Sequence, residues 1–91
     1  MKIPKRVKIG GHIYKIVLKD WDEEKDDDYV DGLVSDQKGT IELNRNLKQT
    51  AVECTFIHEM LHCMNTTLNH ELLDSLAEQI YQALHDNKLL K

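Results

Sequence analysis

The sequence lacks a long apolar run and an excess of basic residues, and each absence excludes a class of protein. No stretch of about 18 apolar residues is present, so we expect no transmembrane helix. The start, MKIPKRVKIGG, is basic but lacks the apolar segment of a secretory signal. The formal net charge of −4 argues against the basic face of a general nucleic-acid binder. We therefore expect a soluble, cytoplasmic protein that binds neither membranes nor nucleic acids.

Cysteine is also scarce, with Cys54 and Cys63 as the two cysteines of the 91-residue chain. They lie nine positions apart in one predicted helix, too far along its axis to form a disulfide. We expect both to be small buried thiols in a reducing compartment. The sequence has no internal repeat and no low-complexity linker, so residues 1–91 are expected to form one domain with a modest core.

The acidic run WDEEKDDDY, residues 21–29, lacks the features of a calcium-binding loop. A calcium loop needs alternating acidic ligands, a central glycine and a closing glutamate at fixed positions. These are missing here, so the run is predicted to be a solvated loop.

The spacing of apolar residues predicts an α+β fold. One β-hairpin is expected to turn at Gly10-Gly11, and a second should pair residues 29–34 with residues 40–44. After residue 46 the spacing becomes helical, and the polar segment 65–69 should separate two helices. We therefore predict a small antiparallel sheet of two hairpins, packed on a two-helix hairpin.

The first predicted helix contains IHEMLH, in which two histidines lie four positions apart and a glutamate follows the first. Residues four apart are about 6 Å apart on one face of a helix, so His58 and His62 can bind one metal ion. Glu59 points elsewhere and can take a proton from a water molecule at the metal. The alternative, an ordinary amphipathic helix, does not explain why polar residues interrupt a largely apolar helix.

A zinc site needs a third protein ligand, which is expected to come from the second predicted helix. The candidates are His70, Glu71, Asp74 and Glu78. A helical wheel centred on Ile80 places His70 and Asp74 at the border of the apolar face. It places Glu71 and Glu78 on the solvent side. We therefore predict His70 as the ligand, with Glu71 as the alternative. Asp74 is expected to accept a hydrogen bond from a ligand imidazole.

These residues resemble a family of zinc peptidases. HEMLH, the preceding Thr55-Phe56-Ile57 and the following HELLDSLAEQIYQALHDN are similar to small phage- and prophage-encoded proteins near the ImmA/IrrE and SprT-like families. The opening KIPKRVKIGGHIYKI and the strand at residues 39–43 extend the resemblance to nearly the whole chain. The family pattern, set on Leu76-Ala77, assigns His70 to the ligand position and Asp74 to the acidic position after it. Many relatives have glutamate as the ligand, whereas histidine is similar to the SprT-like pattern.

The resemblance implies a minimal zincin-like fold and a zinc-dependent metallopeptidase in the cytoplasm of a bacterial host. His58, His62 and His70 would hold Zn²⁺, and Glu59 would act as general base in the hydrolysis of a protein or peptide substrate. An edge strand near the motif helix would hold the extended substrate by backbone pairing. Residues 40–44 are the candidate for that strand.

The sequence contains no clear donor to the transition state. Tyr14, Tyr81, His12 and His85 are candidates, but packing or a surface position explains each of them better. An alternative function keeps the zinc and drops the catalysis: in so short a chain, zinc could stabilise the core of a non-catalytic phage interaction protein. Glu59 favours the enzyme, because a structural zinc site needs no base beside the metal.

Overall fold

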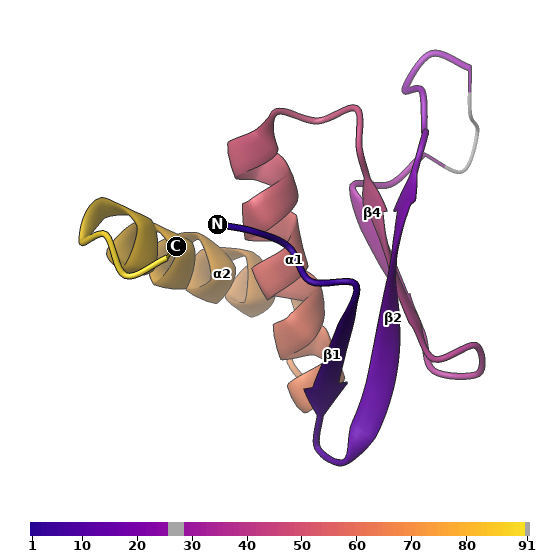
Figure 1. The fold of residues 1–91 in the computed structure, drawn as a ribbon, viewed down its shortest axis with the longest axis horizontal. Helices are drawn as coiled ribbons and strands as arrows, with labels where there is room; N and C mark the ends of the chain where they lie inside the picture. The colour runs from indigo at the N-terminus through magenta and orange to yellow at the C-terminus, as the bar shows by residue number, and fades with distance from the viewer. Residues whose placement is uncertain (26–28, 91) are drawn as a thin grey trace.

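The structure is a computed structural model that describes residues 1–25 and 29–90 (Figure 1). It contains four strands and two helices: β1 (Arg6–Ile9), β2 (His12–Lys19), β3 (Gly32–Ser35), β4 (Thr40–Asn44), α1 (Gln49–Met64) and α2 (His70–Asp86). The predicted α+β class is confirmed. Figure 1 shows α1 between the sheet and α2, so the motif helix has one side on the strands and another on α2.

The sheet is mixed, which corrects the predicted antiparallel sheet. Both predicted hairpins form, β1 with β2 and β3 with β4, but β2 and β4 pair in parallel. The strand order is therefore β1-β2-β4-β3. Burial explains why β4 takes the centre, because Ile41 and Leu43 are fully buried and need neighbours on both sides. The prediction that residues 40–44 bind the substrate as an edge strand is therefore wrong. β4 is paired with β2 on one side and with β3 on the other, so it cannot accept a peptide.

The turn of the first hairpin matches its prediction. Ile9 pairs with His12, which leaves Gly10 and Gly11 as a two-residue turn with φ of 57° and 89°. Such a turn needs two positive φ angles, which glycine adopts without steric cost. The described part of the acidic run contains no strand or helix, and residues 26–28 of that prediction lie outside the described residues.

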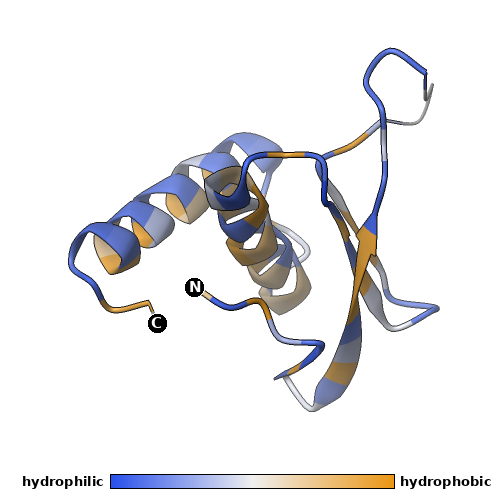
Figure 2. Ribbon diagram, turned by 45° about the horizontal axis from the view of Figure 1, so that its top comes forward, coloured by the Kyte–Doolittle hydropathy of each residue, from blue (hydrophilic) through white to orange (hydrophobic). Residues whose placement is uncertain are grey.

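The main core lies between α1 and the sheet. Its buried members are Ile9, Tyr14, Ile41, Leu43, Val52 and Phe56. Figure 2 shows apolar positions along α1 and the strands, and a further apolar strip along one side of α2. Cys54 and Cys63 are both free thiols, as predicted, but they are half-buried, so the expectation that they are buried was wrong. None of the helices in the described ranges is long and apolar enough to cross a membrane.

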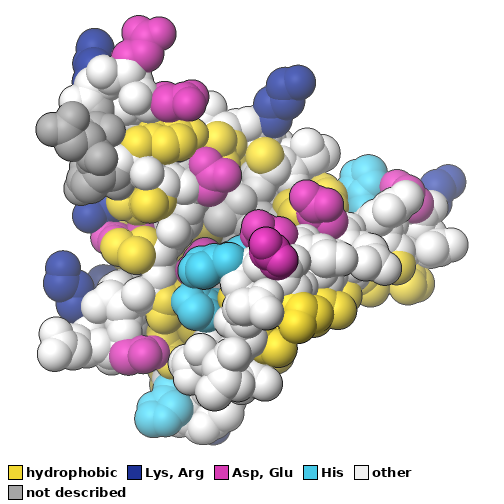
Figure 3. Space-filling view, turned by 180° about the vertical axis from the view of Figure 1, so that it is seen from behind, with side chains coloured by type: hydrophobic (Ala, Val, Ile, Leu, Met, Phe, Trp, Pro, Cys, Tyr) yellow, Lys and Arg dark blue, Asp and Glu magenta, His cyan; other side chains and the backbone are white. Residues whose placement is uncertain are grey.

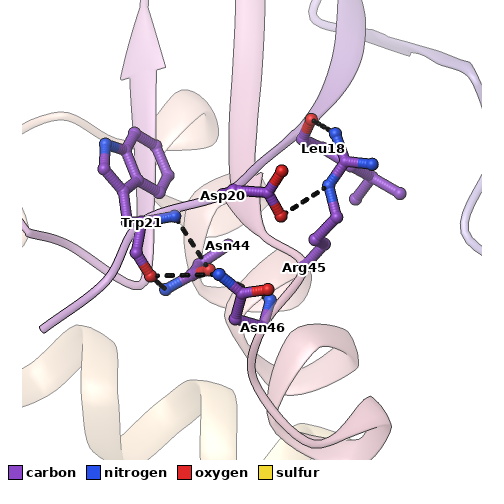
Figure 4. A network of polar contacts seen from close by, with 6 residues as sticks. All are labelled: Leu18, Asp20, Trp21, Asn44, Arg45 and Asn46. Atoms are coloured by element: carbon purple, nitrogen blue, oxygen red, sulfur yellow. Dashed lines mark hydrogen bonds and ion pairs between the residues drawn. The ribbon is translucent and has the colours of Figure 1, made fainter.

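A polar network fixes the connection from the sheet to α1 (Figure 4). Asn44, which is 1% exposed, accepts from the backbone N–H of Trp21 at 3.4 Å and of Asn46 at 3.0 Å. Its Nδ2 donates to the Trp21 carbonyl at 3.2 Å, and Arg45 donates to the Leu18 carbonyl at 2.7 Å. These bonds tie the end of β4 to the segment after β2, so the start of the motif helix is anchored to the sheet.

The second helix is rotated relative to its predicted orientation. The wheel centred the buried stripe on Ile80, but the buried residues are Leu73 and Ala77, while Leu76 and Ile80 are 37% and 36% exposed. In addition, α2 crosses α1 steeply instead of running back along it (Figures 1 and 2). The crossing limits the contact between the helices, so part of the apolar face of α2 is left uncovered.

Candidate metal centre

The three predicted metal ligands meet where α2 begins. The imidazole centroids are 6.5 Å apart for His58 and His62, 6.0 Å for His58 and His70, and 5.6 Å for His62 and His70. The four-residue spacing places the first two on one face of α1. The crossing of the helices then places the first residue of α2 against that face.

Local hydrogen bonds determine where α2 starts. Asn65 Oδ1 accepts from the N–H of Thr67 at 3.0 Å, which forms the turn after α1. Asn69 Oδ1 accepts from the N–H of Leu72 at 2.8 Å and caps the helix, so His70 is its first residue. Leu73, with no exposed surface, then anchors this first turn against α1. The position of the third imidazole therefore follows from a helix cap and one buried leucine.

Asp74 contacts His58, as the sequence predicted. Its Oδ1 lies 3.0 Å from His58 Nδ1, and a proton on that nitrogen leaves Nε2 free to bind a metal. Burial lowers the pKa of the His58 imidazole, although the negative charge of Asp74 acts in the opposite direction. His58 is therefore neutral near pH 7, which is the form that binds metal ions.

Glu59 is buried without a hydrogen bond. Glu59 is 6% exposed. Its Oε1 lies 3.7 Å from His58 Nε2, which is beyond hydrogen-bonding range. Among residues 1–25 and 29–90, no donor reaches its carboxylate closely enough for a hydrogen bond. Burial raises the pKa of Glu59 to about 7. A carboxyl group with this pKa can both accept and return a proton near neutral pH.

Gly32 allows the edge strand β3 to lie directly against Glu59. A Cβ atom at position 32 would lie 2.7 Å from Thr55 Cγ2 and 3.2 Å from Glu59 Cγ. Both distances are shorter than ordinary van der Waals contacts, so only glycine permits this approach of β3 to α1. Sequence analysis did not identify Gly32, although a glycine inside a strand pattern is a known signal of close packing.

Within the described residues, β3 is the last strand of the sheet, and its outer edge pairs with no other strand. Asn44 N–H donates to the Asp31 carbonyl at 2.9 Å, so these opposite residues form a hydrogen-bonded pair. Such pairs alternate along antiparallel strands. The backbone groups of Gly32 and Val34 therefore point away from β4, toward the open edge.

A pocket of about 460 Å³ lies between β3, α1 and α2. Its lining includes His58, Glu59 and His70, together with the further acidic residues Asp31, Asp74 and Glu78. Glu71 is exposed and does not line the pocket, which favours His70 over Glu71 as the third ligand. Glu78 is exposed as predicted, but it stands on the pocket rim. Figure 3 shows histidine side chains grouped on this face with acidic side chains beside them.

The residues fit zinc by type, but the rings are slightly too far apart to enclose an ion. Three imidazoles bound to one tetrahedral zinc would have centroids about 5 Å apart, and the observed separations are 5.6 to 6.5 Å. Among the described residues, no group of three or more His, Cys, Asp or Glu is arranged so that it could hold a metal ion. His62 Nδ1 is buried and lacks a hydrogen-bond partner, as expected for a ring whose bonding is incomplete.

None of the four candidate transition-state donors lines this pocket. The Tyr81 hydroxyl donates to Glu53 at 2.8 Å, and the Tyr14 hydroxyl donates to Asp36 at 3.1 Å. His12 and Tyr14 line a separate pocket at the far end of α1, and His85 packs beside Tyr81 with ring centroids 5.3 Å apart. Packing and surface roles therefore account for these side chains.

The chain matches no protein-family model, no curated protein and no solved structure. Its resemblance to small zinc peptidases therefore stays an expectation from the sequence. The case for a function depends on the pocket, the three histidines and the buried glutamate.

Proposed function

We propose that this protein is a zinc-dependent metallopeptidase, with His58, His62 and His70 as zinc ligands and Glu59 as general base. One observation carries the proposal: three imidazoles lie together, and two of them, His58 and His70, line a pocket beside β3 with the buried carboxyl group of Glu59, which has no hydrogen bond within the described residues. Buried polar groups in proteins are normally hydrogen-bonded, and exceptions require an explanation such as catalysis. The bacterial, phage-encoded origin and cytoplasmic location implied by the resemblance belong to the same proposal.

Each residue has a defined task in this reaction. When bound, zinc would polarise the peptide carbonyl and make water more acidic. Glu59 accepts the proton of the attacking water and passes it to the leaving amine, which suits a carboxyl group with a pKa of about 7. Asp74 fixes the orientation of His58 through its contact with Nδ1.

The substrate would bind as an additional strand along β3. The outward backbone groups of Gly32 and Val34 would pair with an extended peptide. Because Gly32 lies against Glu59, this pairing brings the peptide backbone to the proposed base. In this proposal β3, instead of residues 40–44, is the edge strand that pairs with the substrate.

A non-catalytic, zinc-stabilised interaction protein is the second candidate. The observation that favours it is the uncovered apolar side of α2, where Leu72, Leu76 and Ile80 are 48%, 37% and 36% exposed. Zinc between α1 and α2 would then stabilise a small core. A buried glutamate without a partner is not needed in such a protein, so we place it second.

Metal analysis followed by a peptide-library digest tests the proposal. We expect one zinc per chain, cleavage of library peptides, loss of cleavage in a chelator and its recovery when zinc is restored. One zinc per chain without any cleavage would favour the interaction protein. Carefully prepared protein that binds no zinc would contradict both candidates.

A further inference from the structure

The pocket holds more acidic groups than the proposed reaction uses. Four carboxylates line it, from Asp31, Glu59, Asp74 and Glu78, and no lysine or arginine is among its described lining residues. Glu59 is the proposed base and Asp74 is bound to His58. Asp31 and Glu78 have neither task, and they stand on different walls, one just before β3 and the other on α2.

No basic side chain among the described residues neutralises Asp31 or Glu78. In the described part of the chain, neither Asp31 nor Glu78 forms a salt bridge, whereas Lys19 and Arg45 pair with carboxylates outside the pocket. Asp31 accepts a hydrogen bond from the Tyr29 hydroxyl at 3.2 Å, which leaves its negative charge in place. Both side chains are exposed and can therefore meet a ligand without a change of fold.

The negative charges of Asp31 and Glu78 shift the pKa values of two other residues that line the pocket. Burial raises the pKa of the Cys54 thiol, and the charge of Glu78 raises it further. Asp31 acts on His58 across the pocket, where it opposes the lowering of the imidazole pKa by burial. Figure 3 shows acidic side chains around the histidines, while lysine and arginine lie toward the outline of this face.

We propose that the pocket selects peptides with a lysine or arginine side chain near the scissile bond, and that Asp31 and Glu78 bind this cation. The inference rests on the proposed peptidase function. A peptide paired with β3 would pass beside Asp31, and a side chain directed into the pocket would reach the space between Asp31 and Glu78. The four lining carboxylates outnumber the two positive charges of a zinc ion, so the pocket favours a cation and disfavours an acidic side chain.

Peptides that differ in one side chain test this selection. Each series places lysine, norleucine or glutamate at one position of a cleaved sequence, with both ends blocked so that the side chain is the sole cation. We expect kcat/KM to be about fivefold higher for lysine than for norleucine at low salt, mainly through KM, and the ratio to fall as salt is added. The glutamate peptide should be the poorest substrate.

Variants of the two acidic residues connect the preference to the structure. In a protein carrying both Asp31→Asn and Glu78→Gln, the ratio of lysine to norleucine should fall to about one. Glu24→Gln is the matched control, because Glu24 is an exposed glutamate that does not line the pocket. Glu24→Gln also removes one negative charge, and this variant should keep the wild-type ratio of kcat/KM for lysine to norleucine. A double variant that keeps the full ratio overturns the proposal.

Binding measurements separate this inference from the peptidase function. The same peptides are titrated into the zinc-loaded Glu59→Gln protein, where cleavage should be slow. Preferential binding of the lysine peptide that needs Asp31 and Glu78, without cleavage by wild type, would support the cation site and contradict the peptidase. Equal cleavage of lysine and norleucine peptides would overturn the cation site and keep the peptidase. No cleavage and no preferential binding would overturn both.

Discussion

Two glutamates of α1, Glu53 and Glu59, are buried almost equally but have opposite surroundings. Glu53 is 5% exposed and Glu59 is 6% exposed. Glu53 accepts hydrogen bonds from Tyr81 at 2.8 Å and from Gln49 at 3.0 Å. Burial raises its pKa, but these hydrogen bonds, together with the positive charge of the N-terminal ammonium at 3.7 Å, outweigh burial and leave the pKa below its ordinary value. Glu59 has no such bonds, and burial raises its pKa to about 7.

The comparison shows that hydrogen-bond donors, more than burial, set the pKa values of these two carboxyl groups apart. Glu53 helps to hold α2 on α1 through Tyr81, and its charge is satisfied. Glu59 Oε1 lies 3.7 Å from His58 Nε2, and the Glu59 carboxyl group lines the pocket without a hydrogen bond from the described residues. An unsatisfied carboxyl group costs stability, and proteins keep such groups mainly at functional sites.

The largest expected effect separates the two glutamates by activity. Glu59→Gln should lower kcat on a library-derived peptide by roughly two to four orders of magnitude, because it removes the proposed general base. Glu53→Gln should keep most of the activity of its folded fraction. Steady-state kinetics and zinc content are measured for both variants. Equal losses of kcat at equal zinc content would erase the functional difference between the two residues.

The next largest effect concerns Asp74, which contacts His58 as Tyr81 contacts Glu53. Asp74→Asn should weaken zinc binding by about 10- to 100-fold, the range for losing a partner of a metal ligand. His70→Ala should weaken zinc binding more, because it removes a proposed ligand. Glu71→Ala should leave it nearly unchanged. Competition with a calibrated chelator measures all three. If Glu71→Ala abolishes binding and His70→Ala does not, the third ligand is a carboxylate.

The pKa shifts of the two glutamates predict different pH dependences of stability in the metal-free protein. The pKa of Glu59 rises from 4.5 to about 7 on folding, so the folded state binds more protons in that window. The stabilisation is therefore complete below pH 4.5 and is lost as the pH rises through about 7. The pKa of Glu53 is lowered from 4.5, so its stabilisation is present above pH 4.5 and is lost only in acid.

Urea unfolding in a chelator at pH 5 and pH 8 measures this difference. Wild type should lose roughly 1 to 2 kcal/mol relative to Glu59→Gln between these two pH values, because only wild type carries the raised carboxyl pKa. Relative to Glu53→Gln, wild type should show little change over the same range. Comparison with each variant cancels the titration of the histidines. If the difference in unfolding free energy between wild type and Glu53→Gln also changed between pH 5 and pH 8, Glu53 would titrate in this range as well.

The sequence predicts this fold well where local patterns determine it. Glycines at positions 10 and 11 give the first turn, and the switch to helical spacing gives the two helices. The pairing of β2 with β4 could not be predicted, because alternating patterns do not state which strands are neighbours. The burial of Ile41 and Leu43 determines that order, and burial depends on the whole fold.

The candidate site divides in the same way. The four-residue spacing was enough to bring His58 and His62 onto one face, and the structure shows the predicted contact of Asp74 with one of the histidines, His58. The difference between Glu53 and Glu59 was not predictable, because the donor Tyr81 lies 28 positions along the chain from its acceptor. Donor supply is a property of tertiary packing, and no local pattern encodes it.

The smallest expected effect concerns the hydrogen bond from Tyr81 to Glu53. Tyr81→Phe removes the hydroxyl that donates to Glu53 at 2.8 Å and keeps the aromatic ring. Burial and this bond raise the pKa of Tyr81 to about 12, so the hydroxyl is a donor at every pH of the measurement.

We expect Tyr81→Phe to cost about 1 kcal/mol at pH 7, since Gln49 still donates to the carboxylate and offsets part of the loss. The cost should shrink as the pH falls below 4.5, because the bond to Tyr81 lowers the pKa of Glu53 and is worth most while that group is ionised. Tyr29→Phe is the matched control, since it removes an exposed bond of 3.2 Å to Asp31 and should cost less. Equal costs for the two variants, or a cost for Tyr81→Phe that is independent of pH, would show that Glu53 does not depend on its donor. Donor supply would then not distinguish Glu53 from Glu59.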